Sequence, residues 1–240
     1  MLQGLKKMIR NNQWIGPFYL CVGKAYRNME AKWRFDKKKK AFQEYGIQTF
    51  QLVINTLNGS DIAYFPAFGT LLGLVRDGKL IPHDFDFDFG VITQERHYAW
   101  EKLTHVLEQA GFQIVRWFEC DGVVHEMTFS PPISPYVEID FFAFTRNQDK
   151  YEKYACVKLD NVTYNDKHEF SLLKETLPYF NQFQTKKCLD VDVPIPVNAE
   201  ELLAASYTVF WKKPNPNWKD ADKPNDEVVD GACGILHYPN

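Results

Sequence analysis

The chain has 240 residues, of which 45% are hydrophobic and 15% aromatic, and its formal net charge is −3. This composition can bury a sizeable core and excludes disorder over most of the length. Residues 1–40 contain eleven Lys or Arg and two acidic residues, whereas residues 41–240 contain 17 basic and 29 acidic residues. We therefore expect a basic, aromatic-rich helical leader over 1–40 and a compact acidic domain over 41–240.

The cysteine pattern and the apolar runs favour a cytoplasmic protein. Five widely spaced cysteines without a C-x-x-C motif exclude a disulfide framework and a zinc knuckle. The longest apolar run, 14–23, is interrupted by Gly16 and Pro17 and is too short to cross a bilayer. No signal-peptide pattern is clear. The leader could rest on the inner face of a membrane, or form a solvated arm or an oligomer contact, and the sequence leaves these alternatives open.

Hydrophobic periodicity predicts mixed helices and strands in the first half of the chain. A helical pattern covers 41–57 and is broken at 58–61. The elements expected next are a strand at 62–68, a short helix at 70–76, a strand at 84–92 and a helix at 94–112 that is ended by Gly111.

The second half is predicted to be mainly sheet, which makes the fold class α+β (mixed α/β). An Asp121-Gly122 turn between two apolar runs is a strong hairpin signal. Beyond residue 150 the pattern is weaker. The elements expected are strands at 112–120, 123–129 and 136–144, a helix at 198–207 with Asn198 as its N-cap, and a loop-like tail from Pro214.

Aspartate and phenylalanine alternate strictly over 84–89, within a predicted strand. Residues two apart in a strand share a face, so the three aspartates line one side and the three phenylalanines line the other. Asp is depleted in strands, and like charges held about 7 Å apart are destabilising unless something neutralises them. An amphipathic edge strand with a solvated acidic face would also explain the alternation. A bound divalent cation would in addition remove the repulsion between the carboxylates, and Mg²⁺ prefers carboxylates together with substrate phosphates. The aspartates are Asp84, Asp86 and Asp88.

A second predicted strand, 136–144, repeats the pattern. Glu138 and Asp140 share one face, and Val137, Ile139 and Phe141 share the other. Two such strands lying side by side would pool their acids and could hold two Mg²⁺ ions, the arrangement that serves in-line displacement at phosphorus. Taken alone, this strand would favour a half-exposed edge.

The residues before the aspartates suggest an anion site. Gly69 and Thr70 follow a predicted strand and open a short helix, so backbone N–H groups and the helix dipole could face a phosphate. Arg76 could offer a planar fork to the same phosphate. Neither a Walker loop nor a G-x-G-x-x-G motif is present.

The run "FGTLLGLVRDGKLIPHDFDFDFGV" resembles the LicD/fukutin family of the nucleotidyltransferase superfamily. The resemblance covers roughly 64–92, and "YVEIDFF" and "NAEELLAASY" followed by "PNPNW" fit later segments of that family. It implies a nucleotidyltransferase-like core sheet flanked by helices, to which the basic leader is an addition. Two departures matter: His83 stands in place of a tryptophan, and Phe85 in place of an aspartate.

The resemblance also implies roles for particular residues. Asp86 and Asp88 correspond to the metal-binding pair, and Asp140 to a third acid that touches metal and takes the proton of the acceptor hydroxyl. Donor phosphates would be held at Gly69, Thr70 and Arg76. Independently of the resemblance, Asp84 and Glu138 are expected beside the substrate, and His83 could either contact a phosphate or only pack beside Pro82.

The implied activity is transfer of a substituted phosphate, such as choline phosphate or an alditol phosphate, from a CDP-linked donor to a hydroxyl of a cell-surface glycan. Mg²⁺, or Mn²⁺, would be the cofactor, and CMP would be released. Two alternatives remain: a metal-dependent glycosyltransferase that uses a nucleotide-sugar, and an inactive module that binds a nucleotide or glycan. Nucleic acid is not an expected partner, because the basic residues adjoin no recognition motif, and the six scattered histidines do not indicate a zinc hydrolase.

Overall fold

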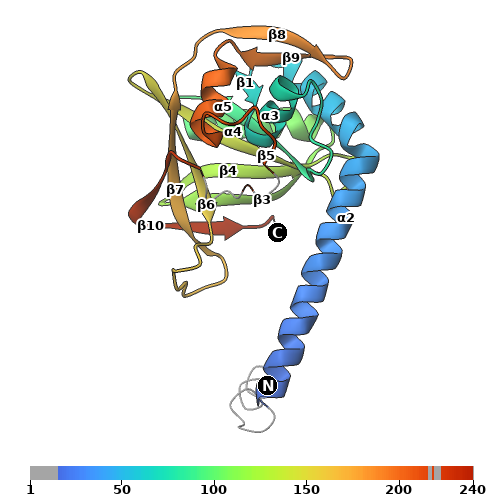
Figure 1. The fold of residues 1–240 in the computed structure, drawn as a ribbon, viewed down its shortest axis with the longest axis vertical. Helices are drawn as coiled ribbons and strands as arrows, with labels where there is room; N and C mark the ends of the chain where they lie inside the picture. The colour runs from blue at the N-terminus through green and yellow to red at the C-terminus, as the bar shows by residue number, and fades with distance from the viewer. Residues whose placement is uncertain (1–15, 216–217, 219–222, 240) are drawn as a thin grey trace.

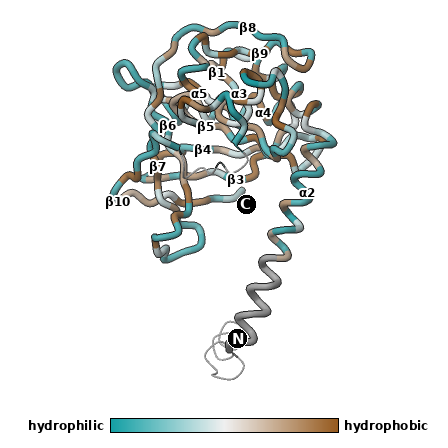
Figure 2. The backbone as a smooth tube through the Cα atoms, in the orientation of Figure 1, coloured by the Kyte–Doolittle hydropathy of each residue, from teal (hydrophilic) through white to brown (hydrophobic). Residues whose placement is uncertain are grey.

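A computed structural model describes residues 16–215, 218 and 223–239, with side chains from residue 29 onward. A single helix, α2 (Gly16–Asn58), runs through residue 40 without a break. Its N-terminal part projects from the body and its C-terminal part packs against it (Figure 1). The packed face buries Phe50, Val53 and Ile54 completely, as the periodicity of 41–57 predicted. The turns that approach the body are mostly hydrophilic in Figure 2.

The body is built on an eight-stranded sheet with the order β1-β2-β5-β4-β3-β10-β7-β6. β6 also pairs with β5, so six of these strands close into a barrel-like circuit. β2 and β5 run parallel, and the other pairs are antiparallel. The strands are β1 (Tyr64–Pro66), β2 (Asp86–Ile92), β3 (Gln113–Cys120), β4 (Val123–Ser130), β5 (Glu138–Asn147), β6 (Lys150–Val157), β7 (Glu169–Pro178) and β10 (Asp226–His237).

Three shorter helices and a separate hairpin complete the described part. They are α3 (Phe68–Arg76), α4 (Arg96–Gln109), α5 (Ala199–Tyr207) and the hairpin of β8 (Phe183–Cys188) with β9 (Val191–Pro196). The described structure is thus mixed α+β, as the sequence predicted, and contains no helix long and apolar enough to span a membrane.

The principal core lies between α2 and one face of the central strands. Phe87 and Phe89 on β2 and Phe141 on β5 are completely buried there. The ring of Phe87 lies 4.7 Å from that of Phe42 on α2, measured between centroids. Because side chains alternate across a strand, burying the phenylalanines on this face turns the aspartates of β2 to the other face.

The elements predicted before residue 150 are confirmed, with ends that differ by a few residues, except that the helix predicted over 41–57 is continuous with the leader helix and begins at Gly16. The expectation of a loop-like tail after Pro214 is wrong for residues 226–237, because β10 lies between β3 and β7 in the sheet. β10 has a register shift between Val228 and Cys233, and many of its residues are exposed. This irregularity removes the alternation by which a strand is recognised from sequence.

Candidate active site

The two carboxylate strands lie side by side, in parallel and in register. Asp86 is the Cα partner of Glu138, and Asp88 is the partner of Asp140. Partners directly across a pair of strands point to the same face. The four acids therefore share the face opposite the phenylalanine core, where the sequence predicted that they would be pooled.

The first turn of α3 holds Asp88 by its backbone. The Asp88 amide donates to Thr70 Oγ1 at 2.9 Å, and the Ala67 amide donates to the Asp88 carbonyl oxygen at 2.9 Å. Thr70 is buried, so its hydroxyl is fixed in this bond. Thr70 thus acts on the site by positioning the backbone of an aspartate.

Gly69 brings the start of α3 close to two carboxylates. A Cβ added at Gly69 would lie 3.1 Å from Asp84 Oδ2 and 3.7 Å from Asp88 Oδ2. The N–H groups of a first helical turn have no intrahelical acceptor and form the positive end of the helix dipole. The helix terminus is therefore directed at the negative charge of the site.

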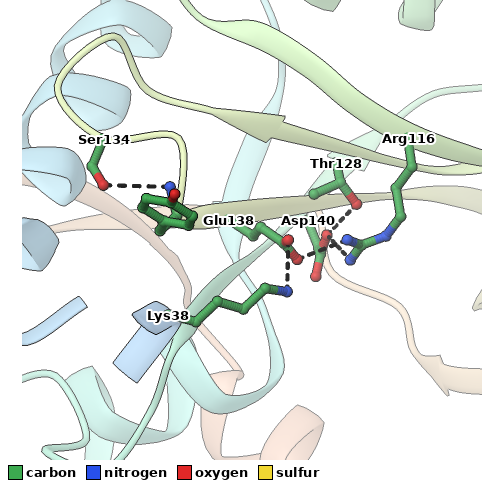
Figure 3. A network of polar contacts seen from close by, with 7 residues as sticks. Lys38, Arg116, Thr128, Ser134, Glu138 and Asp140 are labelled. Atoms are coloured by element: carbon green, nitrogen blue, oxygen red, sulfur yellow. Dashed lines mark hydrogen bonds and ion pairs between the residues drawn. The ribbon is translucent and has the colours of Figure 1, made fainter. Parts of the chain in front are cut away.

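Two cations and a hydroxyl hold the acids of β5 (Figure 3). Arg116 on β3 donates from Nη1 to Glu138 Oε2 at 2.7 Å and from Nη2 to Asp140 Oδ1 at 3.4 Å. The hydroxyl of Thr128 donates to Asp140 Oδ1. Lys38 of α2 forms an ion pair with Glu138, with 2.6 Å between Nζ and Oε1.

The carboxylates differ in how well their charge is compensated. Burial, followed by the charges of Asp88 and Asp140, raises the pKa of Asp86 well above its ordinary value. Burial likewise raises the pKa of Asp84 to about 6. For Glu138, burial acts to raise the pKa, but the positive charges of Arg116 and Lys38 outweigh it and lower the pKa.

The charge of Asp140 is compensated better than that of Asp86 and less well than that of Glu138. Burial raises the pKa of Asp140, although the charge of Arg116 and the hydrogen bond from Thr128 oppose that rise. Among Asp84, Asp86, Glu138 and Asp140, negative charge is therefore least compensated at Asp86.

The donor set suits a hard divalent cation. Within the described residues, no three His, Cys, Asp or Glu side chains are already arranged so that they could hold a metal ion. The carboxylates of Asp86 and Asp88 nevertheless lie on the same face of β2, and the raised pKa of Asp86 reflects burial and the neighbouring acidic charges. Their ligand atoms are all oxygens, as Mg²⁺ and Mn²⁺ prefer. These residues fit such an ion once their side chains adjust to it.

Two residues predicted to contact the substrate lie apart from the acid cluster or at its edge. Arg76 is in the last turn of α3, about 10 Å along the helix from Gly69, and its Nη2 bonds Asp77 Oδ2 at 2.7 Å. His83 is exposed, and its charge acts to lower the pKa of Asp84, so it lies near the cluster. Contact of Arg76 or His83 with a phosphate remains a prediction.

Three residues of the site were not identified from the sequence. Arg116 is a lone cation within the apolar strand "QIVRWFEC", and that position is a signal that could have revealed it. Thr128 carries no comparable signal. Lys38 lies in a run of four lysines, and only the fold distinguishes it from the others.

A separate cavity of about 790 Å³ lies beneath α4. Its lining includes Trp100 of α4 with Trp117 and Met127 of β3 and β4. Trp117 is paired with Met127 and follows Arg116 in the strand, so the cavity is on the face opposite the carboxylates. It therefore plays no part in the acid cluster.

Comparisons with known proteins agree with this geometry. A family model described as "LicD/FKTN/FKRP, nucleotidyltransferase domain" matches residues 61–198, a range that includes α3 and both carboxylate strands. The chain is 28% identical over 146 residues to the uncharacterized protein T07A5.1 of Caenorhabditis elegans, which covers 60% of this chain and 36% of that protein. It is 24% identical over 198 residues to ribitol-5-phosphate transferase FKTN of Homo sapiens, covering 82% of this chain and 40% of that protein.

The protein of the same name from Macaca fascicularis is 25% identical over 198 residues. The matches therefore span well under half the length of these relatives, at 36% to 40%. The family model, in contrast, matches more than half of this chain, 61–198. The chain belongs to the LicD/FKTN/FKRP nucleotidyltransferase-domain family.

Proposed function

We propose that this protein transfers a substituted phosphate from a CDP-linked donor to a hydroxyl of a glycan and releases CMP. The observation that carries the proposal is the register of β2 with β5, which sets Asp86 and Asp88 beside Glu138 and Asp140. A cluster of oxygen ligands next to a helix N-terminus suits the binding of a metal and a diphosphate together.

Family membership supports phosphotransfer over glycosyl transfer. The relatives named ribitol-5-phosphate transferase make an alditol phosphate the first choice for the carried group, and choline phosphate is the second. The acceptor would be a cell-surface glycan. In bacteria that class includes lipopolysaccharide, teichoic acid and capsule.

Each residue has a proposed task. Asp86 and Asp88, with Asp140, would hold Mg²⁺ or Mn²⁺, which when bound neutralises the diphosphate and the charge that develops in transfer. The first turn of α3, at Gly69 and Thr70, would face a donor phosphate. Asp84, Glu138, His83 and Arg76 are proposed to lie along the donor.

The proposed reaction is a displacement at the phosphorus that carries the alcohol. The acceptor oxygen forms a bond to that phosphorus, the anhydride bond from it to CMP breaks, and the hydroxyl proton passes to Asp140. Burial raises the pKa of Asp140, which makes it a better base than an exposed aspartate. Arg116 and Thr128 fix the orientation of its carboxylate.

The direct test is release of CMP from a panel of CDP-alcohols with Mg²⁺ and a glycan acceptor. We expect acceptor-dependent CMP from the native protein and a loss of at least about 100-fold in Asp88→Asn, the scale of losing a metal ligand or its support. Asp149→Asn is the matched control, because Asp149 is exposed in the β5–β6 turn, and it should retain native activity.

Metal binding has an independent readout. Mg²⁺ should raise the melting temperature of the native protein, because a ligand that binds only the folded state stabilises it, and the rise should vanish in Asp88→Asn. Release of a nucleoside diphosphate from nucleotide-sugars would instead establish a glycosyltransferase. Binding of Mg²⁺ and a CDP-alcohol without turnover would establish an inactive binding module.

We also propose a cytoplasmic location with peripheral contact of the segment 1–40 at the inner face of a membrane. Support comes from the eleven basic residues of that segment. Nucleic acid is not proposed as a partner.

A further inference from the structure

α2 reaches the carboxylate cluster, although it lies outside residues 61–198 that the family model matches. The ring of Phe35 on α2 contacts Phe85, between Asp84 and Asp86, with 5.2 Å between centroids. Lys38, one helical turn later, pairs with Glu138 at 2.6 Å. α2 therefore borders the site at the start of both carboxylate strands.

The lysines of the run 37–40 have different surroundings. Lys37 Nζ lies 3.8 Å from the centre of the Trp33 ring and 4.8 Å from that of Tyr136, and it bonds the Tyr136 hydroxyl at 3.2 Å. Lys38 is directed at Glu138 (Figure 3). Lys40 is exposed. Within this run, Lys38 is the lysine that the structure brings to the acid cluster.

Glu138 has a cation on each of its oxygens. Arg116 binds Oε2 at 2.7 Å and Lys38 binds Oε1 at 2.6 Å, and Arg116 also donates to Asp140 Oδ1 at 3.4 Å. Arg116 therefore divides its charge between two carboxylates, whereas the ion pair of Lys38 is with Glu138. Lys38 thus brings a positive charge from α2 to this edge of the acid cluster.

The position of that charge suits a phosphate. Glu138 is directly opposite Asp86 in the parallel pair, and neighbouring strands are about 4.8 Å apart. The ammonium group, which lies 2.6 Å from Glu138 Oε1, is thus beside the strand next to that of Asp86. It has three N–H donors on a flexible stem, so it can keep one bond to Glu138 and offer another to a ligand.

We propose that Lys38 binds the diphosphate of the nucleotide donor, so that α2 forms one wall of the donor site. This inference rests on the proposed function. It makes Lys38 a donor-binding residue that the family segment itself does not supply.

The experiment measures steady-state CMP release and equilibrium binding of CDP with Mg²⁺ for the native protein and for variants of the run. Lys38→Ala should raise the KM for the CDP-alcohol and the Kd for CDP by about 10-fold, the effect of one charged phosphate contact. Its kcat and its acceptor KM should stay within about 3-fold of native. Lys38→Arg should recover most of the donor affinity, because it restores the positive charge.

Lys40→Ala is the matched control from the same helix, and it should leave the donor KM unchanged. A purely structural ion pair would lower the melting temperature of Lys38→Ala without changing the CDP affinity, and that result would overturn the inference. A native protein that releases CMP alongside a Lys38→Ala variant with native donor KM would overturn it too, while leaving the proposed function intact. A native protein that neither binds CDP nor releases CMP would remove both.

Discussion

His125 is a buried histidine on β4 with a cation as its neighbour. Its Nδ1 lies 3.4 Å from Arg96 Nη1, and burial, followed by the charge of Arg96, lowers its pKa from 6.5 to about 4. Above pH 6.5 the ring is neutral in both the folded and unfolded chains. Between pH 6.5 and 4 only the unfolded chain takes up the proton, so this residue reduces folding stability as the pH falls.

The free energy of unfolding of native protein should therefore fall on acidification relative to His125→Gln. The difference should build up between pH 6.5 and 4 and amount to about 2 kcal/mol. Urea unfolding at several pH values checks it. His97→Gln is the control, because the His97 side chain is 92% exposed. If the free energies of unfolding of native protein and His125→Gln changed with pH in the same way, the lowered pKa of His125 would be contradicted.

Single residues differ in how much of their role can be predicted from sequence. Asp86 and Asp88 could be placed on one face, because the strand period is local and the alternation is strict. Lys38 could not be placed, because its partner is 100 positions away in the chain and its neighbours in sequence are identical to it. A local pattern fixes the face on which a residue lies, whereas its partner depends on how distant elements pack.

At the scale of elements, Gly90 on β2 allows the rings of Phe65 and Phe144 to pack closely against the backbone of that strand. A Cβ at this position would lie 2.4 Å from Phe65 Cε1 and 2.9 Å from Phe144 Cδ2. Gly90→Ala should lower the free energy of unfolding by about 2 to 3 kcal/mol, because overpacking forces side chains or backbone to shift.

Gly46→Ala provides the opposite comparison. Gly46 lies inside α2, and an added Cβ would make an ordinary contact of 3.6 Å with the Phe42 ring. Because Ala exceeds Gly in helix propensity, Gly46→Ala should raise stability by about 0.5 to 1 kcal/mol. Urea unfolding of Gly90→Ala and Gly46→Ala measures both changes in the free energy of unfolding. Equal effects of the two substitutions would refute the packing argument.

The elements that the sequence predicted are those with strong periodicity. β2 and β5 bury one face completely and read as alternating strands, and the packed part of α2 reads as a helix. β10 is irregular and β8 is polar, with much of both strands exposed. Their pairing comes from closure of the sheet, which is a long-range property that local patterns do not express.

At the scale of the whole molecule, positive charge is concentrated on α2, which projects from the acidic body (Figure 1). Its described segment 29–40 also exposes Met29, Trp33 and Phe35. Basic and aromatic side chains on one helix favour an anionic lipid surface. We expect the protein to float with vesicles that contain anionic lipid, and to be released by high salt because screening weakens the attraction.

The variant that tests membrane binding must leave the contacts of α2 with the carboxylate cluster intact. Deleting residues 1–40 would also remove Lys38 and so disturb the carboxylate cluster. Changing Lys32, Arg34, Lys39 and Lys40 to Gln leaves Lys37 and Lys38 in place. At about 1 kcal/mol per charge near a membrane, vesicle affinity should fall by at least about 100-fold while CMP release from a soluble acceptor is retained.

The same number of charges removed from the body provides the comparison. Lys150, Lys167, Lys187 and Lys213 are all exposed, and changing them to Gln should leave flotation unchanged. An equal loss in both variants would mean that vesicles sense only the net charge of the protein. Flotation that survives neutralisation of α2 would exclude this helix as the membrane contact. Loss only from α2 would place the carboxylate cluster beside the lipid surface, because Lys38 of the same helix contacts Glu138.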